Sequence, residues 1–337
     1  MSLEKALKEA FAPAEEAVES GRIPGAILGL LTPEGQIGVK VTGLAQRVPG
    51  KRKLTRAIWF DLASVTKVLA TTTEIMKLVE EGIVSLDDPL SKHIPDLHQY
   101  VAAHPIRKLT LRQCLSHQTG LPAVEPIYTW GNDPETLKAH VLQKDWAFGA
   151  NVYSDINFIL LGILIERSRG KALAKLPRGP GLGFLPKNKS FAATEHCMWR
   201  RRVIVGQVHD ENAYSLGGFA GHAGLFGTID GVLGYAKRLL AGKELKPASI
   251  AEIRKRHSAT NNIGWQHHHE GWAGGDDCSP ETIGHTGFTG TGLWIDFKRG
   301  YAWSLLTNRV HPTRHVETGI QDLRKALGNR LAAAMPA

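Results

Sequence analysis

Strand-forming patterns in this 337-residue chain are concentrated near its two ends. Residues 26–31 and 36–41 are short β-prone runs joined by the turn residues Thr-Pro-Glu-Gly, as in a hairpin. Residues 290–296 and 301–307 are β-prone again. A sheet must bury a face against other elements, so we expect the two ends to pair into one antiparallel sheet flanked by the terminal helices.

Between these strands the spacing of apolar residues is mainly helical. Apolar residues three and four apart predict helices over residues 3–20, 64–81, 157–167, 230–240 and 316–333. The Pro-, Gly- and Lys-rich residues 176–189 predict an irregular loop. We therefore expect an α/β (α+β) fold in two domains. Residues 1–63 and 227–337 form the discontinuous sheet domain, and residues 64–226 form a mainly helical domain inserted between them.

The composition describes a globular chain with a large core and a basic surface. Hydrophobic residues make up 42% of the chain, and 41 Lys and Arg against 32 Asp and Glu give a formal net charge of +9. Basic residues cluster at 51–53, 200–202 and 254–256, but without interleaved aromatic residues or a nucleic-acid motif. We interpret these clusters as solvated surface and expect no nucleic-acid partner.

The cysteines and the N-terminal residues indicate the cellular compartment in which the protein works. Cys114, Cys197 and Cys278 are widely spaced, which suggests neither a disulfide framework nor a zinc site and favours a reducing compartment. The first twenty residues lack the apolar stretch of a signal peptide, and no segment approaches the roughly 18 apolar residues of a membrane span. We expect a cytoplasmic chain without a membrane span, or a periplasmic one if an export signal precedes this sequence. The oligomeric state stays open.

Most motifs with a known mechanism are missing from the sequence. There is no GxSxG elbow, HExxH pair, Walker A loop or GxGxxG turn. Ser-x-x-Lys occurs three times, at residues 2–5, 64–67 and 168–171. On a helix this spacing places the lysine one turn from the serine, where a neutral amine can take the proton from the serine hydroxyl and create a nucleophile.

The surroundings of the three copies favour Ser64. Ser2 lies at a chain end, and Gly170 would end the helix before Lys171 could be positioned. Ser64 instead follows an apolar run and opens a long helix, at the positive end of the helix dipole and at the expected domain junction. The alternative is that Ser64 is only a helix N-cap.

Two further groups follow Ser64 in the chain. Tyr153 precedes a strongly apolar helix, and His285-Thr286-Gly287 precedes a Gly-rich strand, where small residues let a substrate lie against the sheet edge. Taken alone, such a tyrosine is more often a core residue, and His-Thr-Gly is nearly uninformative. Ser-x-x-Lys, Tyr-x-Asp and His-Thr-Gly in this order are far more specific together.

The ordered motifs resemble the serine β-lactamase and penicillin-binding-protein superfamily, in the branch of class C β-lactamases, D,D-peptidases and related carboxylesterases. The resemblance covers most of the chain and lies in residues 60–67 (FDLASVTK), 84–90 (VSLDDPL), 115–122 (LSHQTGLP), 153–158 (YSDINF), 285–287 (HTG) and 306–312 (LTNRVHP). A narrower sub-branch, which includes N-acetylmuramoyl-L-alanine amidases, is resembled at residues 192–195 (AATE), 208–213 (VHDENA) and 217–226 (GGFAGHAGLF).

The resemblance implies roles for individual residues and the fold of a class C β-lactamase or D,D-peptidase. Ser64 would be the nucleophile, Lys67 its base or proton relay, and Tyr153 the group that protonates the leaving group. The backbone N–H groups of Ser64 and Phe288 would form the oxyanion hole. The candidate substrate-binding residues are Gln118, Asp155, Asn157, His209, His222, His285, Thr286 and Gly287. No cofactor and no metal are expected.

Two departures from the family pattern bear on the substrate. Asp155 stands where these β-lactamases have the asparagine of Tyr-x-Asn, and near Lys67 it would hold the amine protonated and favour a relay over a simple base. His285 stands where they have the lysine of Lys-Thr-Gly, and a neutral histidine cannot reliably pair with a substrate carboxylate. Efficient β-lactam hydrolysis is therefore less expected than esterase, peptidase or amidase activity. Metal binding by His209, Asp210 and His222 would need a third ligand.

The sequence thus predicts a serine hydrolase that forms an acyl-enzyme at Ser64 on a small-molecule amide or ester. A peptidoglycan-derived substrate is favoured, as for a muropeptide amidase or a D,D-peptidase. One alternative is a promiscuous carboxylesterase or weak β-lactamase. Another is a non-catalytic penicillin-recognising sensor on the same scaffold.

Overall fold

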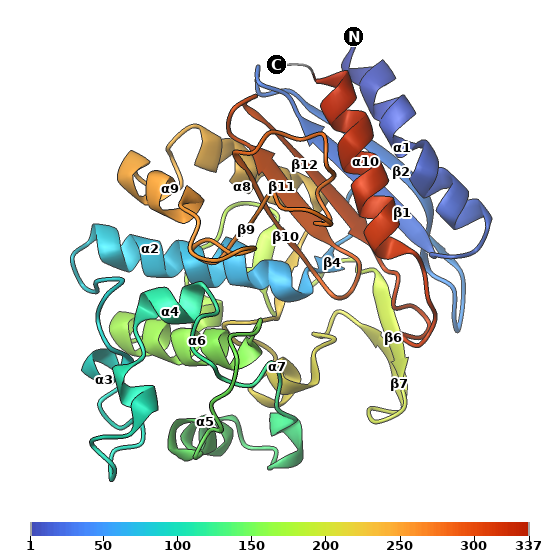
Figure 1. Ribbon diagram of the computed structural model, residues 1–337. Helices are drawn as coiled ribbons and strands as arrows, with labels where there is room; N and C mark the ends of the chain where they lie inside the picture. The colour runs from blue at the N-terminus through green and yellow to red at the C-terminus, as the bar shows by residue number, and fades with distance from the viewer. Residues whose placement is uncertain (1, 336–337) are drawn as a thin grey trace.

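The computed structural model describes residues 2–335, in which strands from both ends of the chain form one sheet (Figure 1). Its seven strands are all antiparallel and lie in the order β3-β2-β1-β12-β11-β10-β9. Their bounds are β1 Gly25–Leu31, β2 Ile37–Gln46, β3 Arg52–Lys53, β9 Gln266–His267, β10 Thr282–Thr286, β11 Gly292–Asp296 and β12 Tyr301–Thr307. Ala26 of β1 faces Thr307 of β12, so the predicted pairing of the two ends is confirmed.

Helices cover both faces of this sheet. Helices α1 (Leu3–Glu19) and α10 (Ile320–Ala334) pack against one face, as Figure 1 shows, and α8 (Ile229–Leu240) packs against the other. Successive residues of β1 alternate accordingly, because Leu28 belongs to the core under α1 and α10 while Ile27 belongs to the core under α8. A Cβ at Gly29 would lie 2.6 Å from Leu233 Cδ1, so this glycine lets α8 pack directly on β1.

Most of the remaining helices gather below the sheet in Figure 1, whereas α9 (Pro247–Arg254) lies beside it. The others are α2 Thr73–Glu80, α3 Leu90–His93, α4 Leu111–Leu115, α5 Pro134–Gln143, α6 Asp155–Arg169 and α7 Glu211–Ser215. Helix α6 is buried throughout from Ile156 to Ile165 and ends at Gly170, whose φ of 60° is left-handed. The predicted helix and its glycine stop are confirmed.

Three local expectations differ from the structure. The predicted helix over 64–81 begins as a 3₁₀ turn, Ala63–Val65, continues as a π-helical segment, Lys67–Thr72, and is α-helical only in α2. Such π-helical segments are frequent at functional sites. The last helix begins at Ile320 rather than near 316. The predicted loop 176–189 contains strand β5 (Leu182–Phe184), which pairs with β8 (Leu225–Gly227).

The block that was expected to be mainly helical also contains strands. Strand β8 pairs with β4 (Phe60–Asp61) as well as β5, and β6 (Ala193–Cys197) pairs with β7 (Arg202–Val205) in a hairpin that extends away from the sheet in Figure 1. Strands of two to five residues carry too little alternation to be recognised in sequence. The division into two domains at the stated boundaries stays a prediction.

The remaining fold expectations concern cysteines and membranes. All three cysteines are buried and free, and burial raises the pKa of Cys114 and of Cys278 to about 12. In the part of the chain that the structure describes, no helix is both long and apolar enough to cross a membrane.

Leu233 provides a test of the packing between α8 and the sheet. It is fully buried, so Leu233→Ala should lower the free energy of unfolding by about 2–5 kcal/mol, through lost apolar burial and the cavity left behind. Urea denaturation measures this change. Tyr100→Ala is the control, because Tyr100 is 89% exposed and should cost about 0.5 kcal/mol or less. Equal losses in the two variants would contradict the packing described.

Candidate active site

Ser64 lies on a sharp turn that follows strand β4. The preceding residue, Ala63, has a φ of 46°, an uncommon left-handed conformation for a residue with a side chain. The buried Asp61 carboxylate holds the turn, because it accepts hydrogen bonds from the N–H of Ala63 (2.9 Å) and from that of His209 (2.6 Å). One buried carboxylate therefore joins the serine turn to the segment that precedes α7.

The turn is also joined to the large sheet. The Thr291 hydroxyl, just before β11, donates to the backbone oxygen of Leu62 (3.0 Å), and the Thr289 hydroxyl donates to that of Asp61 (2.8 Å). Gly287 is packed so closely that a Cβ there would lie 2.4 Å from the Leu62 oxygen. This close approach explains why glycine ends the His-Thr-Gly motif.

Lys67 is fully buried, with its ammonium group in contact with three oxygen atoms. Its Nζ lies 2.9 Å from Ser64 Oγ, 2.7 Å from Asp155 Oδ1 and 3.3 Å from the backbone oxygen of His222. Burial disfavours the charged amine, but the neighbouring Asp155 carboxylate and Tyr153 hold the pKa of Lys67 above its ordinary value. At neutral pH Lys67 is therefore an ammonium group that donates to Ser64.

Tyr153 stands over this pair at the N-terminal end of α6. The Lys67 Nζ lies 4.8 Å from the centre of the Tyr153 ring, and the ring of His117 lies 4.4 Å from it. Burial raises the pKa of Tyr153, against the opposing effect of the Lys67 charge. The resting site thus combines a neutral phenol with a charged amine, and one proton must leave this cluster before Ser64 can be deprotonated.

His285 is neutral at the edge of β10. Its ring is buried, its Nδ1 lies 2.8 Å from the Thr286 backbone oxygen, and burial together with the Lys67 charge lowers its pKa to about 3. A neutral imidazole cannot form an ion pair with a substrate carboxylate, which agrees with the expectation for this position.

A pocket of about 630 Å³ opens in front of Ser64. Its walls include Ser64, Tyr153, Asp155, His209, Asp210, His285, Thr286, Gly287, Phe288, Arg309, Arg314 and Arg324. Within residues 2–335 the N–H of Phe288 donates to no acceptor, so it is free to bind a ligand oxygen. Ser64 and Phe288 line the same pocket, as expected of two donors to one oxyanion.

Three of the predicted substrate-binding residues do not line this pocket. The Gln118 amide donates to the backbone oxygen of His257, and the Asn157 amide oxygen accepts from the Thr119 hydroxyl (2.8 Å). His222 is fully buried, with Nε2 2.8 Å from Asp210 Oδ1. Of the three, His222 contacts a residue of the pocket wall, Asp210. None of the three side chains lines the pocket, so the structure does not support direct substrate contact by them.

The structure also adds residues that the sequence did not indicate. Asp61 holds the serine turn, and His117 packs against Tyr153 while its Nδ1 accepts from the N–H of Ser154 (3.0 Å). Arg309 contacts Phe288 twice, since its Nε donates to the Phe288 oxygen (2.8 Å) and its guanidinium lies 4.7 Å from the ring centre. Asp61, His117 and Arg309 all lie in motifs that carried the resemblance, but their partners are distant in sequence.

The fold places Asp155, rather than His209, beside Asp210 and His222 as a third side chain of the kind that binds metals. The donor atoms of Asp155, Asp210 and His222 lie within 4.8 Å of one another. The Lys67 ammonium group already contacts Asp155, and His222 holds the pKa of Asp210 well below its usual range despite burial. Both carboxylates therefore have cationic or imidazole partners, and we assign no metal to them.

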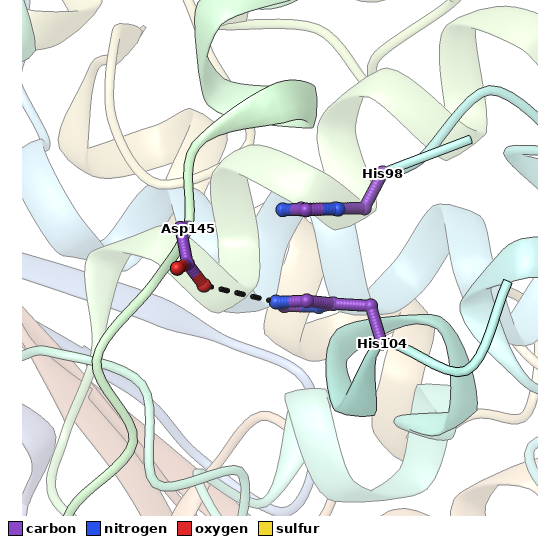
Figure 2. Close-up of side chains that lie close together, drawn as sticks. All are labelled: His98, His104 and Asp145. Atoms are coloured by element: carbon purple, nitrogen blue, oxygen red, sulfur yellow. Dashed lines mark hydrogen bonds and ion pairs between the residues drawn. The ribbon is translucent and has the colours of Figure 1, made fainter. Parts of the chain in front are cut away.

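A second group of metal-type side chains lies apart from the pocket. His98 and His104 stack with ring centres 3.7 Å apart, and Asp145 lies 3.1 Å from His104 Nε2 (Figure 2). Parallel stacked rings direct their nitrogen lone pairs side by side rather than toward one point, so this geometry does not form a ligand set. The expectation of an enzyme without a metal stays a prediction.

Gly287 gives a test of how the site is held together. Gly287→Ala would place a methyl group against the Leu62 oxygen, so it should lower the free energy of unfolding by about 1–3 kcal/mol and shift the amide resonance of Phe288. Gly149→Ala is the matched control, because a Cβ there meets no atom within 4 Å. Denaturation and amide NMR measure both effects, and a Gly287→Ala protein as stable as the control would contradict this packing.

Comparison with known proteins finds β-lactamase relatives along most of the chain. The Beta-lactamase family model matches residues 11–327. The chain is 29% identical to an N-acetylmuramyl-L-alanine amidase of Bacillus subtilis (strain 168), over 91% of this chain and 82% of that protein. It is 32% identical to a putative D-alanyl-D-alanine carboxypeptidase of Salmonella agona (strain SL483), over 81% of this chain and 76% of that protein.

Solved structures show the same fold. The β-lactamase from Sulfitobacter sp. EE-36 superposes with a TM-score of 0.75 at 20% identity, over 99% of each chain. A class C β-lactamase from Rhodobacter sphaeroides superposes with a TM-score of 0.71 at 18% identity, over 98% of this chain and 100% of that one. The predicted fold class is confirmed, and the chain belongs to the Beta-lactamase family as a hydrolase of the serine β-lactamase fold.

Proposed function

We propose that this protein hydrolyses an amide bond in a peptidoglycan-derived substrate through an acyl-enzyme at Ser64. One observation carries the proposal: Ser64 Oγ lies 2.9 Å from the buried Lys67 Nζ, in a pocket that also exposes the free N–H of Phe288. A nucleophile, a proton-transfer group and an oxyanion donor thus face one space.

Acylation follows from the protonation of this cluster. Once Lys67 and Tyr153 together have lost one proton, the cluster can accept the Ser64 hydroxyl proton while Oγ bonds to the substrate carbonyl carbon. The N–H groups of Ser64 and Phe288 donate to the oxyanion that forms, and one such donor contributes about 10²–10³ in rate. When the C–N bond breaks, Tyr153 passes the proton to the leaving amine.

Deacylation repeats these steps with water as the nucleophile. The cluster takes a proton from the water as its oxygen bonds to the acyl carbon, and the ester bond to Ser64 breaks. The proton returns to Ser64 Oγ, and the product leaves as a carboxylic acid. The same chemistry would cleave an ester, so carboxylesterase activity is the alternative within this mechanism.

Charge on the pocket wall supports an anionic substrate. Arg314 is paired with Glu195 and Glu211, but Arg309 forms no ion pair with a carboxylate within residues 2–335. Because His285 is neutral, Arg309 is the better partner for a carboxylate of a wall peptide. Wall peptides also fit the names of the amidase and carboxypeptidase relatives.

Ser64→Ala tests the nucleophile. The wild type should gain the mass of one fluorophosphonate and turn over muropeptides, whereas Ser64→Ala should gain no adduct and lose activity by about 10³-fold or more. Ser168→Ala is the matched control, because Ser168 belongs to another Ser-x-x-Lys copy and lies at the end of α6. An adduct on Ser64→Ala would overturn the proposal. Hydrolysis of p-nitrophenyl esters without muropeptide cleavage would be consistent with the serine mechanism but would exclude a peptidoglycan-derived substrate.

Asp155→Asn tests the role of the buried ion pair. Asp155 raises the pKa of Lys67, so its removal should let the cluster lose its proton at lower pH. The rising limb of kcat/KM against pH should therefore move to lower pH in Asp155→Asn. Asp145→Asn is the control, since the Asp145 side chain is 89% exposed and lies outside the pocket lining. An unmoved or alkaline-shifted limb would contradict this role.

A further inference from the structure

A second hollow, of about 560 Å³, adjoins the active-site pocket. The two share a wall: Val208 lines the hollow, and the next residue, His209, lines the pocket. Consecutive Cα atoms are only 3.8 Å apart, so the same short piece of backbone borders both spaces. The volume falls within the range of about 300–1,000 Å³ that is typical of small-ligand sites.

Three aromatic side chains line this hollow. Trp199 comes from the turn between β6 and β7, Tyr128 precedes α5, and Tyr214 belongs to α7. The rings of Tyr128 and Tyr214 lie 5.0 and 5.8 Å from that of Trp199. Trp199 is 49% exposed, so much of its apolar surface faces solvent rather than the core. An exposed aromatic cluster in a concave site is characteristic of ligand binding.

Arg200 holds this cluster rigidly against the active site. Its guanidinium lies 4.0 Å from the centre of the Tyr214 ring, and it donates to the backbone oxygens of Val208 (2.6 Å) and His209 (3.0 Å). The Tyr214 N–H donates to the backbone oxygen of Asp210 (3.0 Å). The aromatic cluster is therefore fixed to the segment that forms the pocket wall, which is the rigidity a binding subsite needs.

Polar groups surround the aromatic rings. Asn132 and Gln207 line the hollow together with Ser215, and four glycines let a ligand approach the backbone closely. Within residues 2–335 the hydroxyls of Tyr128 and Tyr214 make no hydrogen bond. Apolar ring faces bordered by free donors and acceptors match a pyranose, which has an apolar C–H face and a rim of hydroxyl groups.

We propose that this hollow binds a sugar ring of the substrate while the scissile amide lies at Ser64. The inference rests on the proposed function, since it places the sugar of a peptidoglycan fragment against the Trp199 ring and the amide of the same fragment in the active-site pocket. It makes the protein selective for glycan-linked peptides over free peptides and simple esters.

Trp199→Ala should weaken only the reactions of sugar-bearing substrates. We expect its kcat/KM for an N-acetylmuramoyl-peptide to fall about tenfold, mainly through KM, because one stacking contact is lost. Its kcat/KM for p-nitrophenyl acetate, which has no sugar, should not change. Trp199→Phe, which keeps an aromatic face, should restore most of the loss. Tyr100→Ala, an equally drastic change at an exposed aromatic residue, should behave as wild type.

Direct binding separates this inference from the proposed function. By saturation-transfer NMR, N-acetylmuramic acid should bind the Ser64→Ala protein and lose binding when Trp199→Ala is added, whether or not the wild type cleaves muropeptides. Muropeptide cleavage with no effect of Trp199→Ala would overturn the sugar subsite and leave the proposed function intact. Equal losses on both substrates would also overturn it, as would a loss of self-association in Trp199→Ala with sugar binding unchanged.

Discussion

The buried ion pair between Lys67 and Asp155 is the interaction on which the rest of the site depends. A fully buried ammonium group is costly unless it is paired and hydrogen-bonded, and here Asp155, Ser64 and the His222 backbone oxygen surround it. The same Nζ atom lies 2.9 Å from Ser64 Oγ. The pair also favours an ammonium group at Lys67 in the resting site, so in the proposed mechanism the cluster must lose a proton before Ser64 can attack.

The fold brings three distant parts of the chain to this pair. The serine turn follows β4, Tyr153 and Asp155 lie at the start of α6, and Phe288, the proposed oxyanion donor, follows β10. Hydrogen bonds from Thr289 and Thr291, with the close contact at Gly287, lock the sheet edge onto the serine turn. Since these contacts are short and buried, small displacements of either element would misplace the proposed oxyanion donors.

Much of this arrangement could be predicted from residue patterns. Context favoured Ser64 among three Ser-x-x-Lys copies. The structure agrees with what was expected of the other two, because Ser2 caps α1 by accepting from the Lys5 N–H (3.3 Å) and Gly170 ends α6. The role of Ser64 as the nucleophile stays a prediction. The terminal strands were recognisable by their apolar runs. Asp61, Arg309 and the Trp199 cluster were not, because their roles arise only when segments far apart in sequence meet. Gln118 and Asn157 lie in family-like motifs, yet their side chains bond to His257 and Thr119, which do not line the pocket.

The protonation state of Lys67 tests this account most directly. In protein labelled with ¹³C at the lysine ε-carbon, the signal that disappears in Lys67→Arg can be followed by NMR as the pH is raised. The account predicts that this signal shows an ammonium group at neutral pH and titrates above the range of the exposed lysines, and that Asp155→Asn moves it downward. A Lys67 amine that is already neutral at pH 7 in the wild type would contradict it.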